Sequence, residues 1–101
     1  MGQISRERLT PEGLRAGLSV LSGWNEREGK IQKTFEFTSY WDGVLFASSV
    51  ARIAEEMDHH PDLLISYQRV TVSISTHDAS GITPLDLEFA RRTEELKDSQ
   101  L

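Results

Sequence analysis

The three histidines of the chain are its best candidates for chemistry, because they all fall within the nineteen residues from His59 to His77. His59 and His60 close the run at 55–60 (EEMDHH), and His77 follows a serine and a threonine. An imidazole has an ordinary pKa of roughly 6.5, so it can give and take protons near neutral pH. Imidazoles grouped among carboxylates and hydroxyls predict one polar site with acid–base chemistry.

The neighbours of the first two histidines leave their role open. Glu55 and His59 are four residues apart, so on a continuous helix their Cβ atoms would lie roughly 5–6 Å from each other, and the carboxylate could fix the imidazole tautomer. An ordinary exposed helix pair has the same spacing. A bend before Pro61 could turn His59 and His60 toward one pocket, whereas a helix end carrying cations would look the same.

Other candidate residues also have structural explanations. His77 could be a surface strand residue, Trp24 could be a partly buried aromatic or the wall of a flat ligand, and Asp86 could cap a helix. Glu55, His59 and His77 could supply nitrogen and oxygen to a metal, but the chain lacks the H-E-x-x-H spacing of such sites. We therefore expect neither a metal nor another cofactor. No nucleophile elbow and no glycine-rich phosphate loop is present.

Length and composition predict one domain, with an ordered core over about residues 10–97 of the 101. There is no cysteine, which excludes disulfides and thiolate chemistry and suits a reducing cytosol, so we expect a cytoplasmic protein. The net charge of −5 argues against nucleic acid as a partner. No apolar run reaches the roughly 20 residues that span a bilayer, and no secretory signal is visible.

Helix and strand signals alternate along the first third of the chain. Thr10 and Pro11 are a typical helix start, and leucines at helical spacing follow up to Gly23, a stop signal. Residues 24–27 predict a short strand, followed by a turn near 28–30. Residues 31–37 alternate between apolar and polar side chains, which is the period of a half-buried strand.

A long helix is predicted from Thr38 or Ser39, as its cap, to about Met57. Its apolar residues spread well beyond one stripe: Val44, Leu45, Phe46, Ala47, Val50, Ala51, Ile53, Ala54 and Met57. Such a helix needs cover on two sides, and one small sheet can cover only one of them. We therefore predict a homo-oligomer whose interface includes this helix.

The last third predicts two strands and a helix. Residues 63–67 and 70–76 have strand character, and the alternation of the second places His77 on its polar face. Thr83 and Asp86 have the form of a capping box with proline at the first helical position. The element order is then α-β-β-α-β-β-α. This order favours an α+β fold, a four-stranded antiparallel sheet with three helices packed on one face.

The spacing of the polar residues resembles one enzyme family, the pterin-4a-carbinolamine dehydratases. The matching residues, with their fixed gaps, are Glu55, His59, His60, Pro61, Tyr67, His77 and Asp86. The similarity extends to residues 23–26 (GWNE) and to the phenylalanines at 35 and 37, and covers about residues 10–96. It implies a compact α+β fold with four antiparallel strands and three helices, assembled as dimers or tetramers.

The resemblance also implies a reaction, the loss of water from 4a-hydroxytetrahydropterin to give quinonoid dihydropterin during tetrahydrobiopterin recycling. The substrate forms when an aromatic amino acid hydroxylase uses tetrahydropterin. Because hydroxide is a poor leaving group, an acid must protonate the oxygen on C4a while a base removes the proton of the neighbouring ring nitrogen. Each positioned acid or base typically contributes about 10²–10⁴-fold to the rate.

By position in the motif, the resemblance implies a role for each residue. The proton-transfer set would be His59, His60 and His77, with Glu55 orienting a histidine; the substrate site would also include Asp58, Ser75, Thr76, Asp78 and Trp24. Two alternatives remain: a non-catalytic binding protein on this fold, such as a transcription-factor dimerisation cofactor or an assembly chaperone, and a metal-dependent hydrolase. The intact histidine trio favours the dehydratase.

Overall fold

The computed structural model describes residues 4–100, and the predicted element order is confirmed within them. The elements are α1 (Pro11–Leu18), β1 (Asn25–Arg27), β2 (Lys30–Glu36), α2 (Tyr40–Met57), β3 (Asp62–Ile65), β4 (Arg69–Ile74), the short 3₁₀ helix η1 (His77–Ala79) and α3 (Pro84–Gln100). The four strands form one antiparallel sheet in the order β1-β2-β4-β3. The fold is therefore α+β, as predicted. Among the described helices, none combines the length and the apolar character needed to cross a bilayer.

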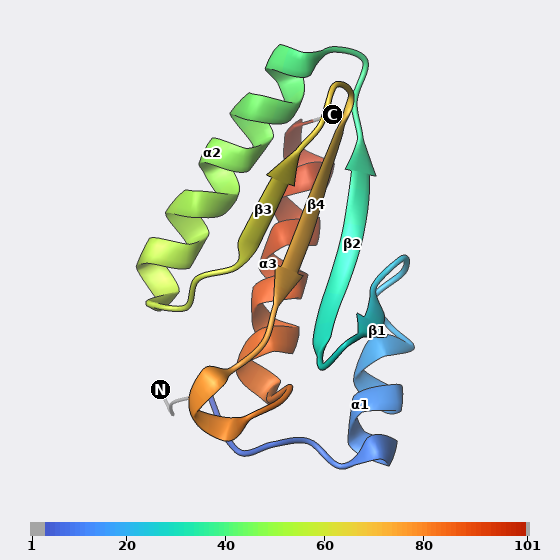
Figure 1. Ribbon diagram of the computed structural model, residues 1–101, viewed down its shortest axis with the longest axis vertical. Coiled ribbons are helices and arrows are strands. Elements are labelled where there is room, and N and C mark those ends of the chain that lie inside the picture. Colours follow the sequence, from blue (N-terminus) through green and yellow to red (C-terminus); the bar gives the residue numbers. More distant parts are fainter. Residues whose placement is uncertain (1–3, 101) are drawn as a thin grey trace.

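One face of the sheet carries the hydrophobic core. The inward side chains of the two central strands are buried, namely Ile31, Phe35, Val70, Val72 and Ile74. Their neighbours on the other face, such as Thr34 and Thr71, are polar and share a hydrogen bond of 2.8 Å. In Figure 1, α3 runs behind the sheet and α1 lies beside β1 at its lower end. The helices thus cover the apolar face, and the polar face stays open.

Local signals set the beginning of each helix. Thr10 accepts the Gly13 amide at 3.0 Å, and Ser39 accepts the Asp42 amide at the same distance. Such caps satisfy amides that have no partner within the helix. The first helix ends at Leu18, before the predicted stop at Gly23, and the hydroxyl of its C-cap residue Ser19 donates to the Ala16 carbonyl.

The long helix α2 packs one side onto the core and leaves the other uncovered in the single chain. Phe46 and Val50 are fully buried, and the Phe46 ring lies 4.8 Å from that of Phe35. On the outer side, Trp41 is 64% exposed and Leu45 is 45% exposed. This distribution agrees with the wide apolar girth seen in the sequence.

The segment around His77 differs from the prediction. We expected a strand over residues 70–76 with His77 continuing its polar face, but β4 ends at Ile74 and His77 begins η1. The chain turns because the Thr76 carbonyl accepts the Ala79 amide at 3.1 Å, while the Thr76 amide donates to Gly81 at 2.9 Å. His77 therefore belongs to a tight turn at the end of the sheet.

Candidate active site

A buried histidine–carboxylate pair is the centre of the candidate site. His59 Nε2 lies 2.6 Å from Asp86 Oδ1, and the two side chains are 8% and 0% exposed. His59 follows the C-terminus of α2, while Asp86 lies in the first turn of α3. Burying a charge is costly in free energy unless it is paired and hydrogen-bonded, so this contact offsets the cost of burying the Asp86 carboxylate.

The second oxygen of Asp86 is held by two threonines. Oδ2 accepts the Thr76 hydroxyl and the Thr83 amide, both at 2.9 Å, and the two threonine hydroxyls lie 2.8 Å apart. We call His59, Thr76, Thr83 and Asp86 the buried polar cluster. The bond to the Thr83 amide confirms the predicted capping box. Asp86 thus caps α3 and binds a histidine at the same time.

The end of α2 explains why His59 points inward. Asp58 adopts the left-handed conformation with φ of 50°, a common way for a helix to end, and its amide returns to the carbonyls of Ala54 and Glu55. The His59 amide also donates to Ala54, at 3.0 Å. The chain therefore reverses within one residue and directs the next side chain toward the start of α3.

Glu55 pairs with His60 rather than with His59. A Glu55–His59 pair would need the helix to continue to residue 59, but α2 ends at Met57. His60 Nε2 instead lies 2.5 Å from Glu55 Oε2. Both side chains of this pair are exposed, at 56% and 76%. The spacing allowed a contact with His59 only if the helix continued, and Glu55 contacts His60 instead. That Glu55 orients a catalytic histidine stays a prediction.

The turn that carries His77 is tied to the cluster through Thr76. Figure 1 shows the chain leaving the lower end of β4 into this turn, from which α3 begins. His77 and Asp78 are exposed on the turn, and Ser75 is half-buried. Thr76 is 1% exposed and its hydroxyl faces Asp86, so it belongs to the interior. The structure therefore joins His59 to the residue that precedes His77.

Trp24 occupies the core instead of the surface of a pocket. It is 3% exposed, its indole N–H donates to Glu94 Oε2 at 2.9 Å, and its ring meets Phe35 edge to face at 6.1 Å between centroids. This placement matches the structural explanation, a buried aromatic with a satisfied N–H. Contact between Trp24 and a flat ligand stays a prediction, and it would require the ring to become uncovered.

Two features of the site escaped the sequence reasoning. Thr83 was expected only as a helix cap, yet its hydroxyl is a member of the cluster. The sequence pattern at Asp86 likewise predicts a helix cap, although the position of Asp86 in the family motif indicates a second role. In the part of the chain that the structure describes, no three His, Cys, Asp or Glu side chains gather as they would around a metal ion.

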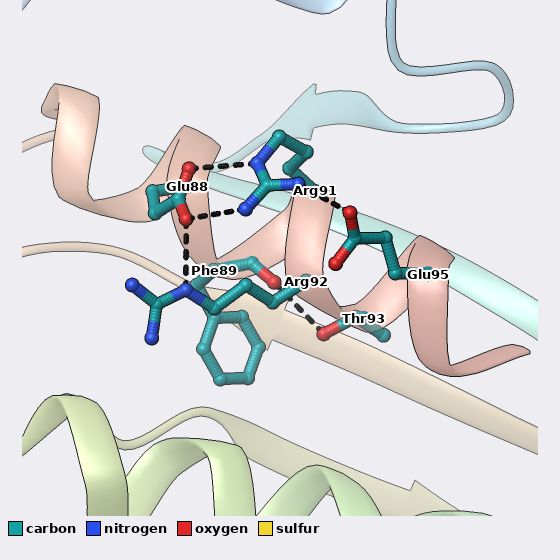
Figure 2. A network of polar contacts seen from close by, with 6 residues as sticks. All are labelled: Glu88, Phe89, Arg91, Arg92, Thr93 and Glu95. Atoms are coloured by element: carbon teal, nitrogen blue, oxygen red, sulfur yellow. Dashed lines mark hydrogen bonds and ion pairs between the residues drawn. The ribbon is translucent and has the colours of Figure 1, made fainter.

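The strongest electrostatic shift lies on α3, away from the cluster. Figure 2 shows Glu88 between Arg91 and Arg92, with Arg91 also reaching Glu95. The hydrogen bond from Arg91, helped by that from Arg92, lowers the pKa of Glu88 to about 2 against the desolvation that would raise it. The hydrogen bonds to Glu88 and to Glu95 raise the pKa of Arg91. These ion pairs stabilise the surface of the helix that carries Asp86.

The fold and the site define a class of protein: a small α+β domain with one buried and one exposed histidine–carboxylate pair. The family model described as pterin 4 alpha carbinolamine dehydratase matches residues 7–96. The chain belongs to this family.

Curated relatives and solved structures agree with this assignment. A protein of Sulfurisphaera tokodaii, named "Putative pterin-4-alpha-carbinolamine dehydratase", is 42% identical over 90 residues, or 89% of this chain and 97% of that protein. One of the same name from Bradyrhizobium sp. is 45% identical over 87 residues, which cover 84% of this chain and 87% of that protein.

A crystal structure from Brucella melitensis, titled a transcriptional coactivator/pterin dehydratase, matches with a TM-score of 0.85 and 33% identity over 89% of this chain and 98% of its own. A pterin dehydratase-like protein, described as a RuBisCO assembly factor in the alpha-carboxysome, shares the fold with a TM-score of 0.60. It is 22% identical and covers 72% of this chain and 84% of its own.

Proposed function

We propose that the chain dehydrates 4a-hydroxytetrahydropterin, a hydro-lyase reaction that regenerates the pterin for tetrahydrobiopterin recycling. In this reaction the C4a–O bond breaks, the neighbouring ring nitrogen loses its proton, and water and quinonoid dihydropterin leave. The observation that carries the proposal is the pair of adjacent histidines, each bound to its own carboxylate, in a chain of the dehydratase family.

The three histidines are the proposed proton-transfer set. His60 and His77 are exposed and can meet a substrate directly, and Glu55 orients the first of them. His59 lies at the edge of the interior, where Asp86 fixes its orientation. A histidine held by a carboxylate presents its other ring nitrogen in a defined direction, which is what general acid–base catalysis requires.

The remaining residues of the proposed substrate site are polar side chains beside these histidines. Asp58 and Asp78 are exposed, and Ser75 is half-buried, so all three can contact a bound heterocycle. The hydroxyl of Thr76 is committed to Asp86, so we assign it no contact with substrate. The protein's part in this elimination is to give one proton to the leaving oxygen and to remove one from the ring nitrogen, and it needs neither a metal nor a redox cofactor.

We also propose a homo-oligomer, a dimer or a tetramer, that forms through the outer side of α2. Tyr40, Trp41 and Leu45 are exposed there, and large apolar groups on one helix face are favourable when a second subunit covers them. The proposed setting is the cytoplasm, with an aromatic amino acid hydroxylase as the source of the substrate.

Stopped-flow dehydration of freshly prepared 4a-hydroxytetrahydropterin tests the function. We expect large losses of rate for at least two of His59→Ala, His60→Ala and His77→Ala, with circular dichroism showing that the fold is retained. A bell-shaped dependence of rate on pH is expected, because an acid and a base must act together. Equal rates for the wild type and all three variants would refute the proposal, and would favour a binding role in which the histidines do no chemistry.

A further inference from the structure

The buried polar cluster has one self-consistent arrangement of its hydrogens. Thr76 is bonded both to Asp86 Oδ2 and to the hydroxyl of Thr83. A hydroxyl has one proton to donate. If Thr76 gives it to the carboxylate, then Thr83 must donate to Thr76. The Thr83 oxygen in turn accepts the Leu85 amide, at 3.2 Å.

This arrangement determines which nitrogen of His59 carries a proton. Asp86 Oδ2 accepts two donors, the Thr76 hydroxyl and the Thr83 amide, so it faces no acceptor. As a carboxylate, Asp86 then offers only lone pairs at Oδ1, where His59 Nε2 lies at 2.6 Å. The proton must therefore be on Nε2, and the nitrogen of neutral His59 that can accept a proton is Nδ1.

We propose that Thr76 is a positioning residue: its hydroxyl holds Asp86 so that His59 keeps its proton on Nε2 and presents Nδ1 for proton transfer. The catalytic part of this inference rests on the proposed dehydratase function. Thr76 is suited to the role by its backbone as well, since its carbonyl and amide close the turn that carries His77. One residue thus sets the tautomer of His59 and the place of His77.

The experiment compares Thr76→Val, which keeps the shape but removes the hydroxyl, with Thr76→Ser, which keeps the hydroxyl. The first measurement is the ¹⁵N spectrum of the His59 ring at a pH where the ring is neutral. We expect the Nε2–H tautomer in the wild type and in the serine variant. In the valine variant we expect a mixture of tautomers, because Asp86 loses the donor that holds Oδ2 and its Oδ1 leaves His59 Nε2 in part of the molecules. This measurement needs no activity, so it stands even if the dehydratase function is refuted.

The second measurement is dehydration kinetics. We expect kcat of Thr76→Val to fall on the order of 10- to 100-fold with KM nearly unchanged, as when a partner that orients a functional histidine is removed, and Thr76→Ser to restore it. A role in folding alone would lower Tm without changing the tautomer. If the valine variant does not fold, Thr76→Cys, whose thiol is only a weak donor, takes its place.

Two results would overturn the inference. The first is a wild-type spectrum that shows the proton of neutral His59 on Nδ1. The second is a folded Thr76→Val protein that keeps both the Nε2–H tautomer and the wild-type kcat.

Discussion

His59 and His60 are consecutive in the chain, yet their side chains lie in opposite environments. The first is 8% exposed and bound to Asp86, and the second is 56% exposed and bound to Glu55. Both contacts use Nε2. The reversal at Asp58 produces this division, because it turns one ring inward and leaves the next outside. Removal of each carboxylate should therefore have a different consequence.

Asp86→Asn should reverse the tautomer of His59. The fixed donors Thr76 and Thr83 would keep the amide oxygen of the new side chain, so its NH₂ group would face Nε2 and force the proton to Nδ1. In serine proteases the corresponding change in the triad lowers kcat about 10⁴-fold. We expect kcat to fall here too, as measured by stopped-flow dehydration. The ¹⁵N spectrum of the His59 ring measures the change of tautomer. Asp98→Asn, an exposed carboxylate of the same helix, is the matched control. An unchanged tautomer would contradict the prediction.

Glu55→Gln should affect rate much more than stability. Exposed ion pairs contribute roughly 0–1 kcal/mol, so the free energy of unfolding should change by less than about 1 kcal/mol. The rate should fall because His60 loses the carboxylate that orients it. Urea unfolding and dehydration kinetics measure the two effects, and Glu56→Gln, a neighbouring exposed residue, is the control. A large loss of stability with an unchanged rate would show that the pair is structural.

The local elements of the chain were predictable, whereas the contacts of the site were not. The caps at Thr10, Ser39 and Thr83 each depend on a residue three positions away, so sequence spacing reveals them. The bond between His59 and Asp86 joins residues 27 apart, and no local pattern specifies it. Only the gaps of the family motif indicated that Asp86 does more than cap a helix.

Two differences between the sequence expectations and the structure have one physical cause. The pairing of Glu55 and the position of His77 both depend on where a regular element stops. Asp58 ends α2 in a left-handed conformation, which asparagine and aspartate tolerate better than most residues but which composition alone does not reveal. The turn at Thr76 is closed by backbone bonds to Gly81, and such bonds leave no mark in the alternation of side chains.

Glu88 should make the stability of the protein depend on acid pH. Because its pKa in the folded chain is about 2 and the ordinary value is 4.5, the carboxylate stabilises the fold fully above about pH 4.5. This contribution is lost as the pH falls from about 4.5 to 2. Urea unfolding at several pH values should show that Glu88→Gln removes a contribution on the order of 1 kcal/mol at neutral pH, and less at pH 2. Equal differences at both pH values would contradict the assignment.

Charged substitutions on the outer side of α2 should dissociate the proposed oligomer. Trp41→Glu and Leu45→Glu together place charges where a second subunit would bury apolar surface, which is costly without a partner charge. Light scattering after size exclusion should give a multiple of 11.4 kDa for the wild type and the monomer mass for the double variant. Val20→Glu, at an apolar residue that is 82% exposed elsewhere, should leave the assembly intact. A monomeric wild type would refute the interface.

Glu94→Gln should destabilise the fold without touching the buried polar cluster. Glu94 Oε2 accepts both the Trp24 indole N–H at 2.9 Å and the Lys33 ammonium at 2.8 Å, so one carboxylate joins α3 to β2 and to the loop before β1. A glutamine oxygen can replace the bonds but not the charge, and Lys33 is only 20% exposed. We expect a loss of about 1–3 kcal/mol in the free energy of unfolding, measured by denaturant, and a change in tryptophan fluorescence. Asp98→Asn should leave both unchanged. Because the bonds of His59 do not involve Glu94, the ¹⁵N spectrum of the His59 ring should be the same in this variant as in the wild type.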